Sequence, residues 1–462
     1  MAGVVFAEVV LAWVLASGRL SSALWAFIAV CVLAVAYRYP MGTAVLALVL
    51  GVSVFYPERF SYAIGPLNLN GSELLLGVLL VIAVIKPGKN TWGGLTGLAV
   101  ALFLIWLGVS IVLCVNAGST ELINAFNWSR VFAMYAFFFV VVRLFGDRES
   151  MRRLLAWSAV IAAVTGFIAL LLSLNVGGAE SFFQDPSQQF IHTEEGLGII
   201  DRIRLPGLSL GYALFWYAVV MIIQTRGRKR VLWSIGLVGM AVDILVSFNR
   251  NMWIGVVIGL LAMLALSGPM VRRRLMGALA VLAFLIVVIG TQPGPESKLS
   301  PLVARGTSLT NSEELFASAS LQSRADETEV AWNVVKANPL AGVGPGVEFG
   351  VSFFEATAPG VWTVVPQLFL HNQYIYLMLV GGVPLLLFFM VYLLTSLRFA
   401  WWRRFRTPES AAWGVGLLSI MLSSIVAIYF AAPDMVFSIA LLTGAIYASA
   451  HGYWEQEEKD SR

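Results

Sequence analysis

Charged side chains are scarce in this sequence of 462 residues. Asp, Glu, Lys and Arg make up 12% of the chain and hydrophobic residues 59%, and the mean hydropathy is +0.83. A soluble globular protein needs many more polar groups to cover its surface, so this composition excludes that class. It predicts an all-α integral membrane protein that crosses the bilayer many times.

Cysteine and histidine are also rare, with two cysteines and three histidines in the whole chain. Cys31 and Cys114 each lie inside an apolar run, where a small buried side chain is commoner than a disulfide or a metal ligand. No His and Cys residues have the spacing of metal ligands, and the acidic residues include no Asp-x-Asp pair. We therefore expect no metal and no cofactor.

Three further patterns are missing. The glycine-rich string at 339–346 is not followed by Lys-Ser or Lys-Thr, which argues against a nucleotide site. No internal repeat of the kind found in two-fold transporters is present. The N-terminal apolar run has no basic leader and contains Glu8, so we interpret it as a first membrane span rather than a cleaved signal.

Long apolar runs fill most of the chain instead. Runs long enough to cross or nearly cross a bilayer predict about 12–14 transmembrane helices. They lie near residues 3–17, 22–37, 41–56, 72–86, 93–115, 122–145, 154–175, 205–224, 231–248, 251–268, 275–291, 371–397, 411–431 and 436–452.

Basic residues are concentrated in alternate connections between these runs. Because cytoplasmic loops of membrane proteins carry an excess of Lys and Arg, these connections and both termini are predicted to be cytoplasmic. The remaining connections, including the two longest, then face outward. The basic connections contain Arg38, Lys86 with Lys89, Arg148 with Arg152 and Arg153, Arg226 to Arg230, Arg272 to Arg274, Arg403 to Arg406, and Lys459.

The chain is predicted to form one membrane domain with an outer cap. Residues 1–291 contain transmembrane helices 1 to 11 and an outer loop at 176–203. Residues 292–370 form the cap, which has an acidic excess, and residues 371–462 contain the last three helices and a short cytoplasmic tail. A connection as long as the cap usually carries function.

An amphipathic helix is predicted inside the cap. Ser323 is its expected N-cap, Ala331, Val334 and Val335 form one apolar face, and Asn338-Pro339 ends it. We expect this helix to lie on the outer surface of the membrane.

Four basic residues fall on the predicted outer side, at or near helix ends. Arg204 opens one span, Arg250 lies between two spans, Arg324 begins the cap helix, and His371 begins another span. Arginine binds phosphate oxygens through two parallel hydrogen bonds, and histidine accepts protons near neutral pH. Together they favour chemistry on a lipid-linked pyrophosphate: the arginines hold the leaving group and His371 activates an attacking hydroxyl.

Plainer explanations exist for each of these residues taken singly. An arginine at a helix end often only reaches the interface, His371 could anchor a head group, and Arg324 could pair with acids of its own helix. Their joint placement on one side favours function. Possible supporting residues are Arg130, Asp243, Asn372 and Tyr374.

The order of four sequence elements resembles the O-antigen ligase and polymerase superfamily of bacterial envelopes. The similarity is clear over roughly residues 200 to 397 and extends to the earlier spans only in hydropathy. LSLGY after the first element and Asn251 in the second depart from the usual pattern. The elements are Arg204-x-Pro206-Gly207; Ser247-x-Asn249-Arg250-x-x-Trp253; Arg324, Ala331-Trp332 and Pro339-Leu340-x-Gly342-Val343-Gly344-x-Gly346; and His371-Asn372-x-Tyr374 with Gly381.

This resemblance implies a metal-independent, inverting glycosyltransferase of the GT-C-like membrane type. Its donor would be an oligosaccharide on undecaprenyl pyrophosphate, and its acceptor a glycan or glycolipid. Arg204 and Arg250 match the pyrophosphate-binding arginines of the family, Arg324 matches the arginine that opens the cap helix, and His371 matches the catalytic or acceptor-side histidine. The site would face the periplasm from the bacterial inner membrane.

Two functional questions stay open from the sequence. A second lipid-linked repeat as acceptor makes the protein a polysaccharide polymerase, whereas a lipid A core or another terminal acceptor makes it a ligase. The cap string Glu-x-x-x-Ala-Trp-Asn resembles that of exopolysaccharide polymerases, and this resemblance favours the polymerase. A flippase for the lipid-linked sugar is the alternative of a different class. Membrane lipids, a chain-length regulator and a flippase are the expected partners, and no nucleic acid is expected.

Overall fold

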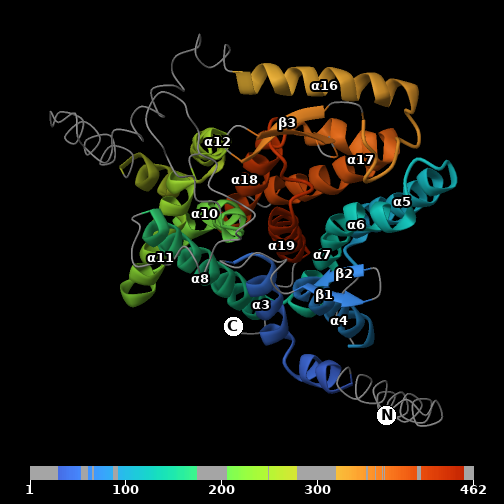
Figure 1. Cartoon of the computed structure of the whole chain (residues 1–462). Helices are drawn as coiled ribbons and strands as arrows, with labels where there is room; N and C mark the ends of the chain where they lie inside the picture. Colours follow the sequence, from blue (N-terminus) through green and yellow to red (C-terminus); the bar gives the residue numbers. More distant parts are fainter. Residues whose placement is uncertain are drawn as a thin grey trace.

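The computed structural model describes residues 30–53, 61–64, 67–86, 92–173, 205–247, 249–277, 319–349, 352–358, 361–366, 368, 370–402 and 407–451. In this part the chain is an all-α integral membrane protein with two short β-hairpins (Figure 1). The expected runs at 3–17, most of 275–291 and the first part of 22–37 lie outside the described residues.

Except for the helix in the cap, the helices overlap the predicted apolar runs. They are α3 (Pro40–Gly51), α4 (Gly71–Ile85), α5 (Gly94–Asn116), α6 (Leu122–Ala133), α7 (Phe137–Leu144), α8 (Arg148–Ser173), α10 (Gly207–Gln224), α11 (Gly227–Val246), α12 (Arg250–Leu266), α16 (Ala319–Ala337), α17 (Gln373–Trp402), α18 (Pro408–Ser423) and α19 (Pro433–Ala450), with the 3-10 turn η2 (Met134–Ala136) joining α6 to α7.

Six of the described helices are long and apolar enough to cross a membrane, and a bent pair raises this to seven. The pair is Val30–Arg38 with α3, which meet at 110° just before Pro40. Proline lacks a backbone N–H and clashes with the preceding turn, so a break at this point is expected. The total of about 12–14 spans includes residues outside the described part and stays a prediction.

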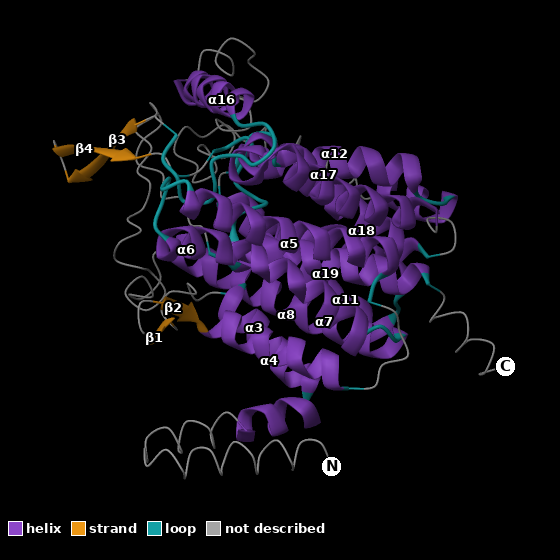
Figure 2. Cartoon of the chain, turned by 90° about the vertical axis from the view of Figure 1, so that its right-hand side faces the viewer, coloured by secondary structure: helices purple, strands orange, loops and turns teal. Residues whose placement is uncertain are grey.

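The ends of the helices gather at two ends of the bundle. At one end Arg152 of α8 lies 3.2 Å from Glu409 of α18, and Arg143 of α7 donates to the carbonyl of Ala83 in α4 at 3.3 Å. At the other end the amide of Gly207 donates to the Ser53 carbonyl at 2.7 Å. Both hairpins lie on the left side of the bundle in Figure 2, well apart from each other. The predicted grouping of basic connections at one end agrees with these contacts.

Helices α10 and α19 form the centre of the bundle. The apolar window of α19 is 89% buried and that of α10 is 72% buried, whereas that of α5 is 33% buried. Small residues bring neighbouring helices close: a Cβ added to Gly166 in α8 would lie 1.9 Å from the carbonyl oxygen of Gly239 in α11. Close approach of backbones at small residues is how helices pack in lipid, where burial of apolar groups contributes little.

The glycine-rich string after α16 seals a break in α17. Helix α17 loses helical geometry at Gly381 and Gly382. The amide of Val343 donates to the freed carbonyl of Leu379 at 2.7 Å, and the Trp106 indole donates to the Gly381 carbonyl at 2.7 Å. Backbone groups inside a membrane protein need such partners. The string therefore serves packing, and the rejection of a nucleotide site agrees with this role.

Substituting Gly382 with alanine tests this junction. Gly382 has φ +70°, and a Cβ there would lie 2.2 Å from the carbonyl oxygen of Leu340. We expect Gly382→Ala to lower stability by about 2 kcal/mol, because backbone strain and overpacking add. Thermal unfolding of the purified protein measures the loss. The control is Gly77→Ala in α4, where a Cβ has no neighbour within 4 Å; equal midpoints for the two variants would contradict this account of the junction.

The cap helix is confirmed, with one correction. Helix α16 ends at Ala337, just before Asn338-Pro339, and Ala331 and Val335 are buried. The prediction of Ser323 as N-cap is wrong, since α16 already begins at Ala319. Four further helical residues without Gly or Pro precede Ser323, so Ser323 lies inside the helix and not at its N-cap.

Neither hairpin was predicted. Strands β1 (Ser61–Ile64) and β2 (Leu67–Asn70) pair antiparallel, as do β3 (Ser352–Ala358) and β4 (Val361–Pro366) of the cap. The signals were present, since Gly65-Pro66 and Pro359-Gly360 separate short runs rich in β-branched and aromatic residues. These segments are short and lie outside the apolar runs of helix length that the sequence contains.

Candidate active site

A histidine and a glutamate meet where α16 crosses the start of α17. The Nδ1 atom of His371 lies 2.9 Å from Oε2 of Glu327. The Glu327 side chain is 9% exposed and that of His371 is 29% exposed, so the imidazole reaches solvent while its partner is buried. An ionised carboxylate only accepts hydrogen bonds, so a hydrogen bond to one places a proton on Nδ1 and leaves Nε2 of a neutral ring as the acceptor.

Packing of the cap helix holds Glu327 in this position. Ala331 lies one turn later and is completely buried, and Val335 is 3% exposed. Because residues four apart share a face of a helix, the face that carries Glu327 turns toward the membrane helices. In Figure 1, α16 lies across α17.

Arg324 lies one turn before Glu327 on the same face of α16. Burial lowers the pKa of the Arg324 guanidinium from its usual value, and interactions with Glu327 and then Tyr429 oppose this change. An arginine stays protonated under these conditions. A half-buried, charged guanidinium therefore stands beside the His371–Glu327 pair.

Tyr429 connects this group to the start of α12. Its side chain is 1% exposed and belongs to the loop between α18 and α19. The amide Nδ2 of Asn249 donates to the Tyr429 hydroxyl at 3.4 Å. Asn249 directly precedes Arg250, so the first turn of α12 lies on the side of the bundle that carries Arg324 and His371.

The turn before α12 fixes the backbone around Arg250. The side chain of Asn249 accepts a hydrogen bond from the Asn251 amide at 3.2 Å and so caps the helix. Asn251, where the related pattern has a small residue, donates to the carbonyl of Val426 at 3.3 Å. Trp253 donates to the carbonyl of Ile244 in α11 at 2.9 Å. Arg250, half-buried, is thereby held in the first helical turn.

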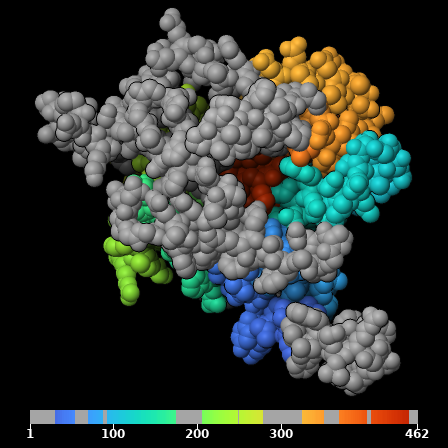
Figure 3. Space-filling view, in the orientation of Figure 1, coloured from blue at the N-terminus to red at the C-terminus, as the bar shows by residue number. Residues whose placement is uncertain are grey.

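Arg204 lies outside the described residues, but the start of its span does not. Leu205 is buried, Gly207 is tied to Ser53, and the hydroxyl of Ser209 donates to a carboxylate oxygen of Asp434 at the start of α19. Helices α10 and α19 therefore begin at one end of the bundle. Figure 3 shows part of the C-terminal helices (red) near the centre of this face, beside α16–α17 (orange) and α5 (cyan).

Arg130 has a contact with another helix. Its Nε lies 3.5 Å from Oε1 of Glu73, whose other carboxylate oxygen accepts from the Asn70 amide at 2.8 Å and caps α4. This ion pair joins α6 to α4. A supporting function of Arg130 at the anion site stays a prediction.

Two of the remaining three supporting residues, Asn372 and Tyr374, hold helices in place. Asn372 caps α17 by accepting from the Ile375 amide at 3.3 Å. The hydroxyl of Tyr374 donates to the Met421 carbonyl of α18 at 2.7 Å. Both contacts fix the helix start next to His371. Asp243 is fully buried, and neither carboxylate oxygen has a hydrogen-bond partner among the described residues.

Sequence reasoning missed the importance of Glu327 and Tyr429. Glu327 was considered only as a partner for Arg324 in its own helix, yet its contact with His371 spans 44 positions. Tyr429 had no signal beyond its aromatic type. Among the described residues, no group of three or more His, Cys, Asp or Glu is arranged to hold a metal ion.

A comparison with known protein families gives a match for the segment that contains these residues. Residues 235–390 match the model of the family described as O-antigen ligase. Over these residues, about a third of its length, the chain is similar to the O-antigen ligase family. The resemblance to the ligase and polymerase superfamily is thus confirmed, and the matched segment contains Arg250, Arg324, Glu327 and His371. No protein in the curated set matches the chain.

Proposed function

We propose that this protein is a glycosyltransferase that moves a glycan from undecaprenyl pyrophosphate to a hydroxyl group of an acceptor glycan. Its similarity to the O-antigen ligase family supports a membrane enzyme of the ligase and polymerase type. The observation that supports glycan transfer is the His371–Glu327 contact, with Arg324 one helical turn from Glu327. It places a proton acceptor near a guanidinium that can bind a phosphate.

His371 acts as the general base in this proposal. Nε2 takes the proton of the acceptor hydroxyl as its oxygen attacks the anomeric carbon of the donor sugar. The bond from that carbon to the pyrophosphate oxygen breaks, and the leaving group takes the electron pair. Glu327 keeps Nδ1 protonated and stabilises the imidazolium that forms. Attack from the face opposite the leaving group inverts the anomeric configuration.

The arginines bind the pyrophosphate and stabilise the negative charge that it gains as it leaves. Arg250 and Arg324 present planar forks that match two phosphate oxygens each, and Arg204 is proposed as the third. The charge of the leaving group grows as the glycosidic bond breaks, so cations already in place stabilise the transition state more than the bound donor.

The polymerase is the form that we favour, on the pattern of the cap helix. The ligase, with lipid A core or another terminal acceptor, uses the same chemistry and differs in the acceptor alone. By the positive-inside rule the basic end is cytoplasmic. The site would then face the periplasm of a bacterial inner membrane, where a flippase and a chain-length regulator are the partners to test.

Incubation of the purified protein with a defined lipid-linked repeat tests this function. A polymerase produces a ladder of products, whereas a ligase produces a single addition on a supplied acceptor. Because the mechanism derives its charge stabilisation from arginines, activity is expected to persist in EDTA. Activity that EDTA abolishes and a divalent ion restores would contradict the metal-free mechanism, and transport without glycan joining would indicate a flippase.

Glu327→Gln tests the proposed positioning of the imidazole. Glutamine keeps the size of the side chain but can present an N–H to Nδ1, which favours the wrong tautomer of His371. We expect kcat to fall about 10²-fold with an unchanged KM for the donor. Steady-state rates measure both constants. The matched control is Glu329→Gln on the exposed side of α16; a rise in KM at constant kcat would instead assign Glu327 to binding.

A further inference from the structure

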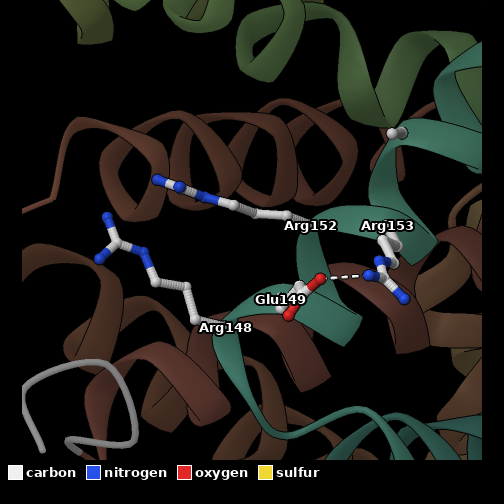
Figure 4. A pocket seen from close by; sticks show the side chains of 5 residues that line it. Arg148, Glu149, Arg152 and Arg153 are labelled. Atoms are coloured by element: carbon white, nitrogen blue, oxygen red, sulfur yellow. Dashed lines mark hydrogen bonds and ion pairs between the residues drawn. The ribbon is translucent and has the colours of Figure 1, made fainter. Parts of the chain in front are cut away.

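A second cluster of arginines lies at the opposite, basic end of the bundle. A surface pocket of about 440 Å³ at the start of α8 is lined by Arg148, Glu149, Arg152, Arg153 and Ala156. Figure 4 shows the side chains of Arg148 and Arg152 extending to the same side, while Arg153 meets Glu149 on the other. The described part of the proposed active site has no residue in this pocket.

Three guanidinium groups and one carboxylate line the pocket. The carboxylate belongs to Glu149, which forms an ion pair with Arg153. Arg152 lies 3.2 Å from Glu409 of the neighbouring α18. A guanidinium has five N–H donors in a fixed fork, so an arginine that contacts a carboxylate can also donate to a phosphate. The lining therefore favours an anion.

An exposed apolar stripe begins where the pocket ends. Trp157, Val160 and Val164 follow Arg153 along α8 at helical spacing, and they are 53%, 50% and 48% exposed. Such a stripe on a membrane-spanning helix faces lipid chains. Trp157 stands between the arginines and the aliphatic part, at the level where tryptophan sits in membrane interfaces.

We propose that this pocket binds the phosphate head group of an anionic phospholipid from the leaflet at the basic end. The arginines contact the phosphate, and the acyl chains lie along the stripe that starts at Trp157. A soluble phosphate would use the arginines but make no contact with the stripe. Because Arg152 also contacts α18, a lipid held here would tie α8 and α18 together at this end.

Native mass spectrometry of the full chain in mixed micelles tests the proposal. The protein receives equal amounts of phosphatidylglycerol and phosphatidylcholine with the same acyl chains. The wild type should retain phosphatidylglycerol in preference. R148Q/R153Q should lower that preference about 25-fold, at about fivefold per arginine near a membrane surface. Arg152 is left in place to preserve its contact with Glu409. The matched control R228Q/R273Q removes two exposed arginines of the same end and should keep the wild-type ratio.

Two outcomes would overturn the proposal. One is the same loss of preference in R148Q/R153Q and R228Q/R273Q. The other is displacement of phosphatidylglycerol by inorganic phosphate at equal concentration, which would indicate a soluble anion. If R148Q/R153Q does not fold, modification of wild-type arginines by phenylglyoxal replaces it. Phosphatidylglycerol, and not phosphatidylcholine or phosphate, should then protect Arg148 and Arg153 relative to Arg228.

Discussion

His371→Gln is expected to lower kcat for glycan transfer about 10³-fold while the donor still binds. Glutamine has a similar length and can hydrogen-bond to Glu327, but its amide does not accept a proton from a hydroxyl near neutral pH. The loss therefore falls on the chemical step. Initial rates with a defined lipid-linked donor give kcat, and donor affinity is measured separately by fluorescence quenching of the purified protein.

His451→Gln is the matched control for this experiment. His451 lies at the end of α19 and stacks on Tyr447 with ring centroids 3.9 Å apart. It follows the C-terminal end of α19, at the end of the helix opposite Asp434, and its exchange should leave kcat unchanged. A wild-type kcat in His371→Gln would remove the general base from the mechanism. In a double variant with Glu327→Gln the losses should not add, because both residues serve one proton transfer.

Arg250→Gln is expected to lower kcat/KM for the donor about 10²-fold to 10³-fold. The guanidinium at the start of α12 binds the pyrophosphate in this proposal, and its charge counts most when the leaving group departs. Arg250→Lys should recover part of the loss, because lysine keeps the charge but not the planar fork. Rates measured over a range of donor concentrations separate the effect on kcat from the effect on KM.

Two observations decide whether Arg250 has this function. Arg228→Gln removes an exposed arginine of the basic end, where α11 begins, and should leave kcat/KM unchanged. Arg250→Lys with the full activity of the wild type would show that charge alone suffices and would contradict bidentate binding. Thermal unfolding of each variant confirms that Asn249 and Asn251 still hold the start of α12.

The sequence predicted Arg250, Arg324 and His371 as residues of the proposed site but gave few of their contacts. They were predicted because a charged group at a helix end is costly in a membrane and the motif order is specific. Glu327 was one of several acids in the cap, and only the packing of Ala331 and Val335 selects it as the partner of His371. Arg204 lies outside the described residues, so its place in the site stays a prediction.

Class, approximate spans, the two ends of the bundle and the cap helix were set by the sequence alone. Transfer free energies of apolar and charged side chains belong to single residues or short segments, so they can be read along the chain. The seal over the break in α17, the His371–Glu327 pair and the contact from Asn249 to Tyr429, 180 positions apart, were decided by the tertiary structure. Which distant residues meet depends on how helices pack, and that depends on the shapes of many side chains together.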